Sequence, residues 1–245
     1  MAMTLHLTWH WRKLSLNSAM PRRPGHATGQ LVFHVLNRAI QNAVLFETPE
    51  DYRAFLRLFI EAAARVPMRL LAYALMPNHW HLVLWPDRDG QLSDFMRWLT
   101  ARHAESIRVR SGDRGRGAVY QGRFKAIAVQ CDAHFLRLCR YVERNPIRAR
   151  LVEGAEDWEW SSASRQSAAP WRPCLEPWPV ARPVDWLDEL NGPERGRELD
   201  LIRTAIQRSR HFGDPEWRNL IVGNLAWRCG RGPGRPAGSA SPTRP

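Results

Sequence analysis

Four short apolar stretches along the chain predict strands. They are residues 30–39 (QLVFHVLNRA), 68–77 (MRLLAYALMP), 79–86 (HWHLVLWP) and 122–130 (GRFKAIAVQ). The first is rich in Val, Leu and Phe, which is typical of a strand. The second and third meet at a Pro-Asn pair, so we expect a short turn to join them.

Helical signals lie between and after these stretches. Residues 48–51 (TPED) provide an N-cap, proline at the first helical position and acids in the first turn, so a helix should begin here. A second helix is expected at about residues 92–110. A third should begin at Asp132 and end near Asn145-Pro146, where proline stops it. The apolar stripe of the first helix is formed by Phe55, Leu58, Phe59 and Ala62.

The order of these elements predicts the fold class. Strand, helix, strand, strand, helix, strand and helix is the order of an α+β protein with a ferredoxin-like split βαβ antiparallel sheet and one added helix. The predicted helices beyond residue 193 add a small α-helical region on the C-terminal side of this sheet. The chain is long enough, at 245 residues, to bury a core of its own.

Changes in composition divide the chain into five parts. Residues 1–19 add nothing to the fold pattern and are interpreted as a disordered leader or a start assigned too early, whereas residues 20–155 hold all the predicted strands. Residues 156–193 are rich in Trp and Pro and are expected to form a strap over the first domain. Residues 194–228 are predicted to form a helical hairpin, a possible DNA-binding unit of the helix-turn-helix type. Residues 229–245 are low-complexity and basic, and are expected to be disordered.

The net charge favours a polyanionic partner. The formal net charge is +12 and the isoelectric point is near 10.8, and all basic residues except Lys13 and Lys125 are arginines. Such a field attracts nucleic acid, although a GC-rich genome would produce the same arginine bias. No apolar run approaches the roughly 20 residues of a membrane-spanning helix, and no secretory signal is recognisable. We therefore expect a cytoplasmic, nucleoid-associated protein that does not bind membranes.

Two histidines lie one residue apart in the third predicted strand. Side chains alternate along a strand, so His79 and His81 should share one face while Trp80 points to the other. Two imidazoles on one face can bind the same metal ion. An H-x-H pair alone is more often two ordinary polar-face histidines, and only further residues can decide between these interpretations.

Those further residues are on the third predicted helix. Tyr141 and Asn145 are four residues apart, so they should share a helical face away from the apolar stripe. Nearby cations attract a phosphodiester and are expected to favour the phenolate form of the tyrosine. The alternative is a tyrosine half-buried at the edge of the helix. The neighbouring cations are Arg137, Arg144 and Arg148.

Three ordered motifs together resemble one family. They are Met76 to Leu84 (MPNHWHLVL), Gly122 to Val129 (GRFKAIAV) and Arg140 to Val152 (RYVERNPIRARLV). Their combination is similar to the REP-associated tyrosine transposases, which are IS200-like enzymes of the HUH superfamily that act on single-stranded DNA. The resemblance covers about residues 20–235 and implies that residues 20–155 form an HUH-type catalytic domain.

The resemblance implies a role for each matching residue. Tyr141 matches the nucleophile, while His79, His81 and Asn145 match the residues that bind Mg²⁺ or Mn²⁺. The implied activity is a metal-dependent tyrosine transposase and nickase, which cleaves and rejoins hairpin-forming single-stranded DNA through a 5′-phosphotyrosine intermediate. Arg150 stands where the family usually has glycine, which puts the local backbone shape in question.

Basic residues around the proposed nucleophile are expected to bind DNA. Residues 101–150 contain 12 Lys and Arg against 4 Asp and Glu, an excess of 8. A Gly-Arg-Pro segment at residues 234–236 resembles a minor-groove arm. The helical hairpin before this segment can either recognise a DNA hairpin or pack on the catalytic domain. The candidate DNA-binding residues are Arg123, Lys125, Arg137, Arg144, Arg148 and Arg235.

Two other functions remain open at this point. A histidine-triad nucleotidyl hydrolase would need H-x-H-x-H, but Val83 occupies the third position. A non-catalytic or domesticated nucleic-acid-binding protein would need the fold without the chemistry. The chain can act as a monomer or a homodimer on either reading.

Overall fold

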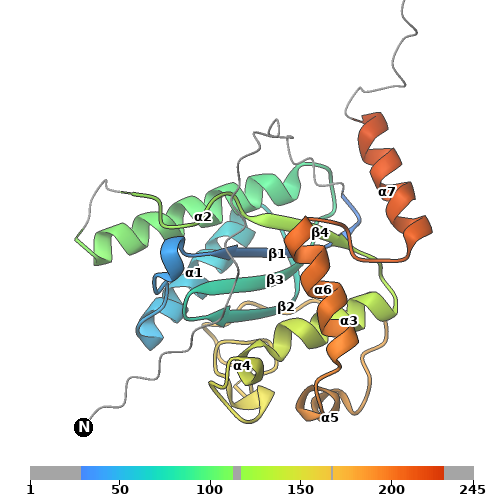
Figure 1. Cartoon of the computed structure of the whole chain (residues 1–245). Helices are drawn as coiled ribbons and strands as arrows, with labels where there is room; N and C mark the ends of the chain where they lie inside the picture. Colours follow the sequence, from blue (N-terminus) through green and yellow to red (C-terminus); the bar gives the residue numbers. More distant parts are fainter. Residues whose placement is uncertain (1–28, 113–116, 167, 229–245) are drawn as a thin grey trace, which may run out of the picture.

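The structure is a computed structural model that describes residues 29–112, 117–166 and 168–228. The predicted leader (1–19) and tail (229–245) lie outside these residues, and so does Arg235. The described part is built around a four-stranded antiparallel sheet with the order β2-β3-β1-β4 (Figure 1). This is the order of a split βαβ sheet, so the predicted fold class is confirmed. The strands are β1 (Val32–Arg38), β2 (Arg69–Met76), β3 (His79–Trp85) and β4 (Lys125–Val129).

Helices cover both faces of the sheet (Figure 1). α1 (Pro49–Arg65) and α2 (Gln91–Arg110) pack on one face, in a core that contains Trp80 of β3. α3 (Ala133–Glu143) packs on the other face, in a second core that contains Val83. The two faces of β3 are therefore buried against different helices, as the predicted alternation requires.

The first helix begins where the sequence predicts. Thr48 is the N-cap of α1, and its backbone N–H donates to the Asp51 side chain over 2.9 Å. This bond belongs to a capping box, which satisfies backbone donors that the first turn of a helix leaves free. Arg110, at the end of α2, forms an ion pair with the same carboxylate and so connects the two helices.

The third predicted helix is interrupted near the expected position. α3 ends at Glu143, and a separate short helix, α4 (Asn145–Arg148), follows Arg144. Pro146 has no backbone N–H and cannot continue the hydrogen bonds of α3. Tyr141 and Asn145 therefore belong to two consecutive helices, which corrects the expectation that one continuous helix carries both.

The end of α4 is closed by a left-handed residue. Arg150 has a φ of 56°, the Arg150 N–H donates to the Ile147 carbonyl oxygen, and the Leu151 N–H donates to the Pro146 carbonyl oxygen. This pattern is a Schellman motif, whose left-handed position is usually occupied by glycine. The unexpected residue at this position is thus held in a conformation that glycine adopts more easily.

Segments from the C-terminal half cover both edges of the sheet. The Trp/Pro-rich strap runs along β2, where the Leu75 N–H donates to the Trp160 carbonyl oxygen and the Ser162 N–H donates to the Tyr73 carbonyl oxygen. At the other edge, the Phe212 N–H donates to the Ala128 carbonyl oxygen of β4. Covering these edges removes unpaired backbone groups that would otherwise attract another strand.

The remaining elements of the described residues are two short 3-10 helices and three α-helices. α6 (Gly196–Arg208) packs against α3 and β4, and the carbonyl oxygen of its residue Ile206 accepts a 2.9 Å hydrogen bond from the Lys125 side chain. Among the described residues, no helix is long and apolar enough to cross a membrane. The bounds are Ile40–Asn42 for the 3-10 helix η1, Ala155–Asp157 for η2, Trp186–Asn191 for α5, Gly196–Arg208 for α6 and Pro215–Arg228 for α7.

Candidate active site on the α3 face of the sheet

The two histidines of β3 lie on the face that α3 covers. Their ring centroids are 5.1 Å apart, and the ring of Tyr141 on α3 lies 5.7 Å from that of His81. His81 is buried, whereas His79 and Tyr141 are partly exposed. The structure therefore brings together residues 60 positions apart in the sequence, in a place that remains accessible from one side.

Asn145 completes this group from the first turn of α4. The Asn145 side chain forms a hydrogen bond with His79, and its amide nitrogen lies 3.4 Å from the Tyr141 carbonyl oxygen. All four side chains come from the same chain. We refer to His79, His81, Tyr141 and Asn145 as the candidate active site.

Both histidines of this site are neutral at physiological pH. Burial lowers the pKa of His79 to about 3, and the charges of Arg38 and Arg148 act in the same direction. Burial also lowers the pKa of His81, and the neighbouring His34 and His79 lower it further. Neutral imidazoles are the form that binds metal ions.

Hydrogen bonds engage the same nitrogen in both rings. The His79 Nδ1 lies 2.7 Å from the Asn78 Oδ1, and the His81 Nδ1 lies 2.9 Å from the His34 Nε2. A metal ion bound by the two histidines would therefore be bound through Nε2 of each. Partners on the remote nitrogen are the usual way in which proteins orient ligating histidines.

Tyr141 is a protonated phenol in this environment. Burial raises its pKa, although the charges of Arg148 and Arg203 oppose the rise. The Arg148 guanidinium carbon lies 4.4 Å from the centroid of the Tyr141 ring. The nearby cations do favour the phenolate, as expected, but the loss of solvent outweighs them, so the net pKa is raised.

Two residues of β1 join the site without having been singled out in the sequence. His34 is buried against His81, with ring centroids 5.1 Å apart, and Arg38 pairs with His79 in the register of β1 and β3. The Nε of Arg38 is buried and has no hydrogen-bond partner among the described residues. Positions 34 and 38 lie on the same face of β1. The alternation of side chains along a strand is the signal in the sequence that indicates this shared face.

Several of the candidate DNA-binding arginines have partners inside the chain. Arg144 is buried and donates to the carbonyl oxygens of Leu190 and Gly192, so we assign it a structural role and withdraw it from the proposed DNA contacts. Arg148 lies over Tyr141 and pairs with Glu194 at 3.5 Å. Burial explains the correction for Arg144, because its guanidinium lies inside the protein and its Nη1 already donates to two fixed acceptors.

The other basic candidates are more exposed. Arg123 is exposed just before β4, and Lys125 is exposed although its ammonium donates to the Ile206 carbonyl oxygen. Arg137 lies 3.4 Å from Glu198 of α6, an ion pair that is about one third exposed. DNA contact by any of these residues stays a prediction.

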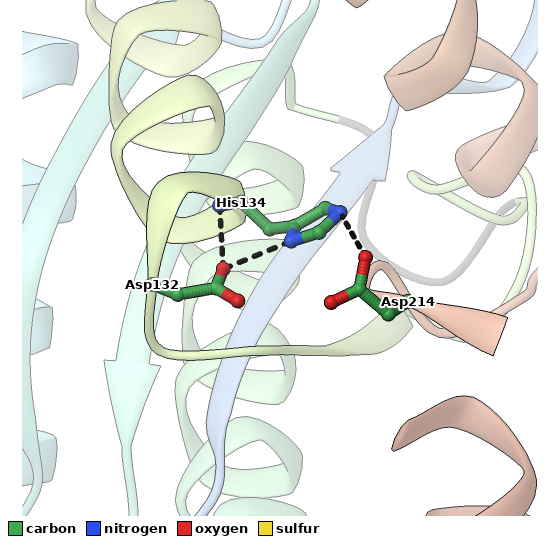
Figure 2. A group of neighbouring side chains, drawn as sticks. All are labelled: Asp132, His134 and Asp214. Carbon is green, nitrogen blue, oxygen red and sulfur yellow. Dashed lines mark hydrogen bonds and ion pairs between the residues drawn. The ribbon is translucent and has the colours of Figure 1, made fainter. Parts of the chain in front are cut away.

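A second group of possible metal ligands lies at the start of α3. Asp132, His134 and Asp214 approach one another there (Figure 2). Asp132 lies 2.8 Å from the His134 Nδ1, and Asp214 lies 3.7 Å from the His134 Nε2. The carboxylates thus flank opposite nitrogens of one ring, which suits a link between α3 and the loop before α7 better than three ligands around one ion.

The fold and the site have the arrangement that the sequence motifs predict. The central strand β3 of the split βαβ sheet presents His79 and His81 toward Tyr141 on α3. Residues 27–145 match the family model described as Transposase IS200 like, which contains both histidines, the tyrosine and the asparagine. This part of the chain is therefore similar to the IS200-like transposases.

Two solved structures are similar to this chain, and the first of them supports the same fold. A structure described as the REP-associated tyrosine transposase bound to a REP hairpin matches with a TM-score of 0.50 and 18% identity, covering 67% of this chain and 98% of the other. A crystal structure of a candidate transposase from Deinococcus radiodurans R1 matches with a TM-score of 0.35 and 17% identity, covering 54% and 92%. A search of curated proteins finds no significant match.

Proposed function

We propose that this protein is a metal-dependent tyrosine transposase that cleaves and rejoins single-stranded, hairpin-forming DNA. The observation that carries the proposal is the meeting of Tyr141 with His79, His81 and Asn145 on one face of the sheet. Tyr141 is 60 positions from His81 in the sequence, and the fold brings these polar side chains together. Together they form a nucleophile beside a set of metal ligands.

The donor set fits a divalent cation. His79 and His81 are neutral, their Nδ1 atoms are engaged, and Asn145 adds an amide oxygen. Nitrogen and oxygen donors without thiolates suit Mg²⁺ or Mn²⁺ and accept other transition metals as well. When bound, the ion would polarise a phosphate and offset the charge that develops on it.

The chain's own residues supply the nucleophile and position it. The Tyr141 Oη would attack the scissile phosphorus, so that an O–P bond forms while the bond from phosphorus to the 3′ oxygen breaks. Because burial raises the pKa of Tyr141, its proton leaves as the new bond forms, and the departing 3′ oxygen takes up a proton. The product is a 5′-phosphotyrosine and a free 3′-hydroxyl, and reversal of the same step rejoins a strand.

Cations around the site would hold the DNA backbone. Arg148 lies over the ring of Tyr141, and Arg38 pairs with His79 in the register of the sheet. A guanidinium suits contact with phosphate oxygens because of its planar set of donors. A hairpin substrate is supported by the structural neighbour, which is described as bound to a REP hairpin.

A covalent-trapping experiment tests this function. Labelled single-stranded hairpin DNA from sequences that flank the gene is incubated with the full chain and Mn²⁺, and the products are separated on a denaturing gel. We expect an adduct with the natural protein that is absent with Tyr141→Phe and after addition of a chelator. Tyr52→Phe is the matched control, since Tyr52 is buried in the core on the opposite face of the sheet and should leave the adduct unchanged.

The opposite result is equally informative. If several hairpins bind to saturation and none forms an adduct, the transposase proposal is wrong for this chain. A non-catalytic nucleic-acid-binding protein would then be the better reading.

A further inference from the structure

His34 is a buried polar residue with one polar partner. Its exposed fraction is 1%, its Nε2 lies 2.9 Å from the His81 Nδ1, and its Nδ1 has no partner among the described residues. An apolar residue at this position of β1 would pack without leaving a polar atom unsatisfied. The partner that His34 does have is a residue of the candidate active site.

Apolar side chains line a small cavity beside the His34 ring. They come from three elements, namely β4, α3 and the C-terminal helix α6, with one more from the loop after α6. These apolar surroundings offer the ring no polar partner, so the partner that orients it is His81. The lining residues are Ile127, Val129, Leu138, Ile202, Ala205, Ile206 and Phe212.

The bond between the two rings restricts the tautomer of His81. One hydrogen lies between the His34 Nε2 and the His81 Nδ1. If His34 donates it, the proton of neutral His81 must sit on Nε2, and that nitrogen cannot bind a cation. If His81 donates it, the Nε2 of His81 carries a free lone pair.

We propose that His34 is a positioning residue that accepts the His81 Nδ1–H and so keeps the His81 Nε2 free to bind a divalent cation. This inference rests on the proposed function, because it concerns the same cation. It assigns to β1 the role that a carboxylate or a backbone carbonyl plays behind many ligating histidines. It also places α6 beside the site, since three of its side chains line the cavity next to His34.

Metal affinity and tautomer are the two measurements that test this role. Mn²⁺ binding to the full chain is measured by calorimetry, and the protonated ring nitrogen of His81 is identified by ¹⁵N NMR without metal. His34→Gln places an amide oxygen near the position of Nε2 and should keep the affinity. His34→Leu fills the space without an acceptor and should weaken Mn²⁺ binding by about 10-fold to 100-fold.

Controls separate this role from a purely structural one. His103→Leu removes another buried histidine, in the core on the opposite face, and should leave the Mn²⁺ affinity unchanged. Thermal unfolding of each variant shows whether it is folded. If folded His34→Leu binds Mn²⁺ as the natural protein does, or if His81 carries its proton on Nε2 in the natural protein, the positioning role is wrong.

The same data distinguish a failure of the proposed function. If the natural protein forms no covalent adduct, the transposase proposal is contradicted, whatever the tautomer of His81. An adduct that forms normally in both natural protein and His34→Leu would contradict only the role of His34. The tautomer measurement needs neither metal nor DNA, so it tests His34 in every case.

Discussion

The guanidinium of Arg148 lies over the ring of Tyr141 and also donates to the Tyr141 carbonyl oxygen over 2.7 Å. A single side chain thus contacts both the ring and the backbone of the proposed nucleophile. We expect Arg148→Ala to slow adduct formation by about 100-fold, because it removes a cation from the place where phosphate charge develops. Arg148→Lys should recover only part of the rate, since an ammonium lacks the planar donors.

Single-turnover adduct formation on hairpin DNA measures this effect. Arg97→Ala serves as the control, because Arg97 is on α2, which packs on the opposite face of the sheet, and it pairs with Asp94 at 3.0 Å. Equal rates for the natural protein and Arg148→Lys would show that charge alone matters at this position.

Replacing the left-handed residue after α4 should stabilise the protein. Arg150 has a φ of 56° in a Schellman motif, and a side chain with a Cβ is strained there. Arg150→Gly should raise the free energy of unfolding by about 0.5–1 kcal/mol, the relief being partly offset by the greater freedom of glycine in the unfolded chain. Urea denaturation measures the change. Arg150→Ala keeps the Cβ and should give no gain, so an equal gain from both variants would point to the lost charge instead.

The contact between α1 and α2 should depend on pH through Asp51. Burial alone would raise the pKa of this carboxyl, but the backbone donors at Thr48 and Glu47 and the guanidinium of Arg110 outweigh it, so the net pKa is lowered. A lowered folded-state pKa gives stability that is present above the ordinary pKa and lost as the pH falls through the folded-state value. Asp51→Asn should therefore cost about 1–2 kcal/mol at neutral pH and progressively less in acid.

Unfolding free energies between pH 7 and pH 3 test this prediction. Asp94→Asn is the matched control on α2, because Asp94 forms an exposed pair with Arg97 that should contribute little at any pH. A cost of Asp51→Asn that stays constant down to pH 3 would contradict the role of its charge.

Ser162 should be important for attachment of the strap. Its hydroxyl accepts from the Tyr73 N–H over 2.9 Å and donates toward the buried carboxylate of Glu143 at 2.5 Å. Ser162→Ala leaves both groups without this partner and should lower the free energy of unfolding by about 1–3 kcal/mol. Ser161→Ala is the neighbouring control, since the Ser161 hydroxyl makes one long bond, 3.3 Å, to the Trp158 carbonyl oxygen. Similar small losses for both variants in thermal unfolding would contradict this attachment.

Local patterns in the sequence determined much of the fold and part of the site. Alternation along 79–86 was enough to place His79 and His81 on one face and Trp80 on the other, because side-chain direction in a strand depends only on position along it. The start of α1 at Thr48 and the interruption near Pro146 follow from single residues whose backbone preferences are strong.

Relations between distant segments were decided by the tertiary structure. His34 meets His81 only because β1 pairs with β3 in one register, and Arg144 is occupied by carbonyl oxygens of residues 190 and 192 that no local pattern connects to it. The net rise in the pKa of Tyr141 likewise depends on burial by neighbours from other elements. Periodicity predicts which face a side chain occupies, whereas packing between elements decides what that face meets and how much solvent remains.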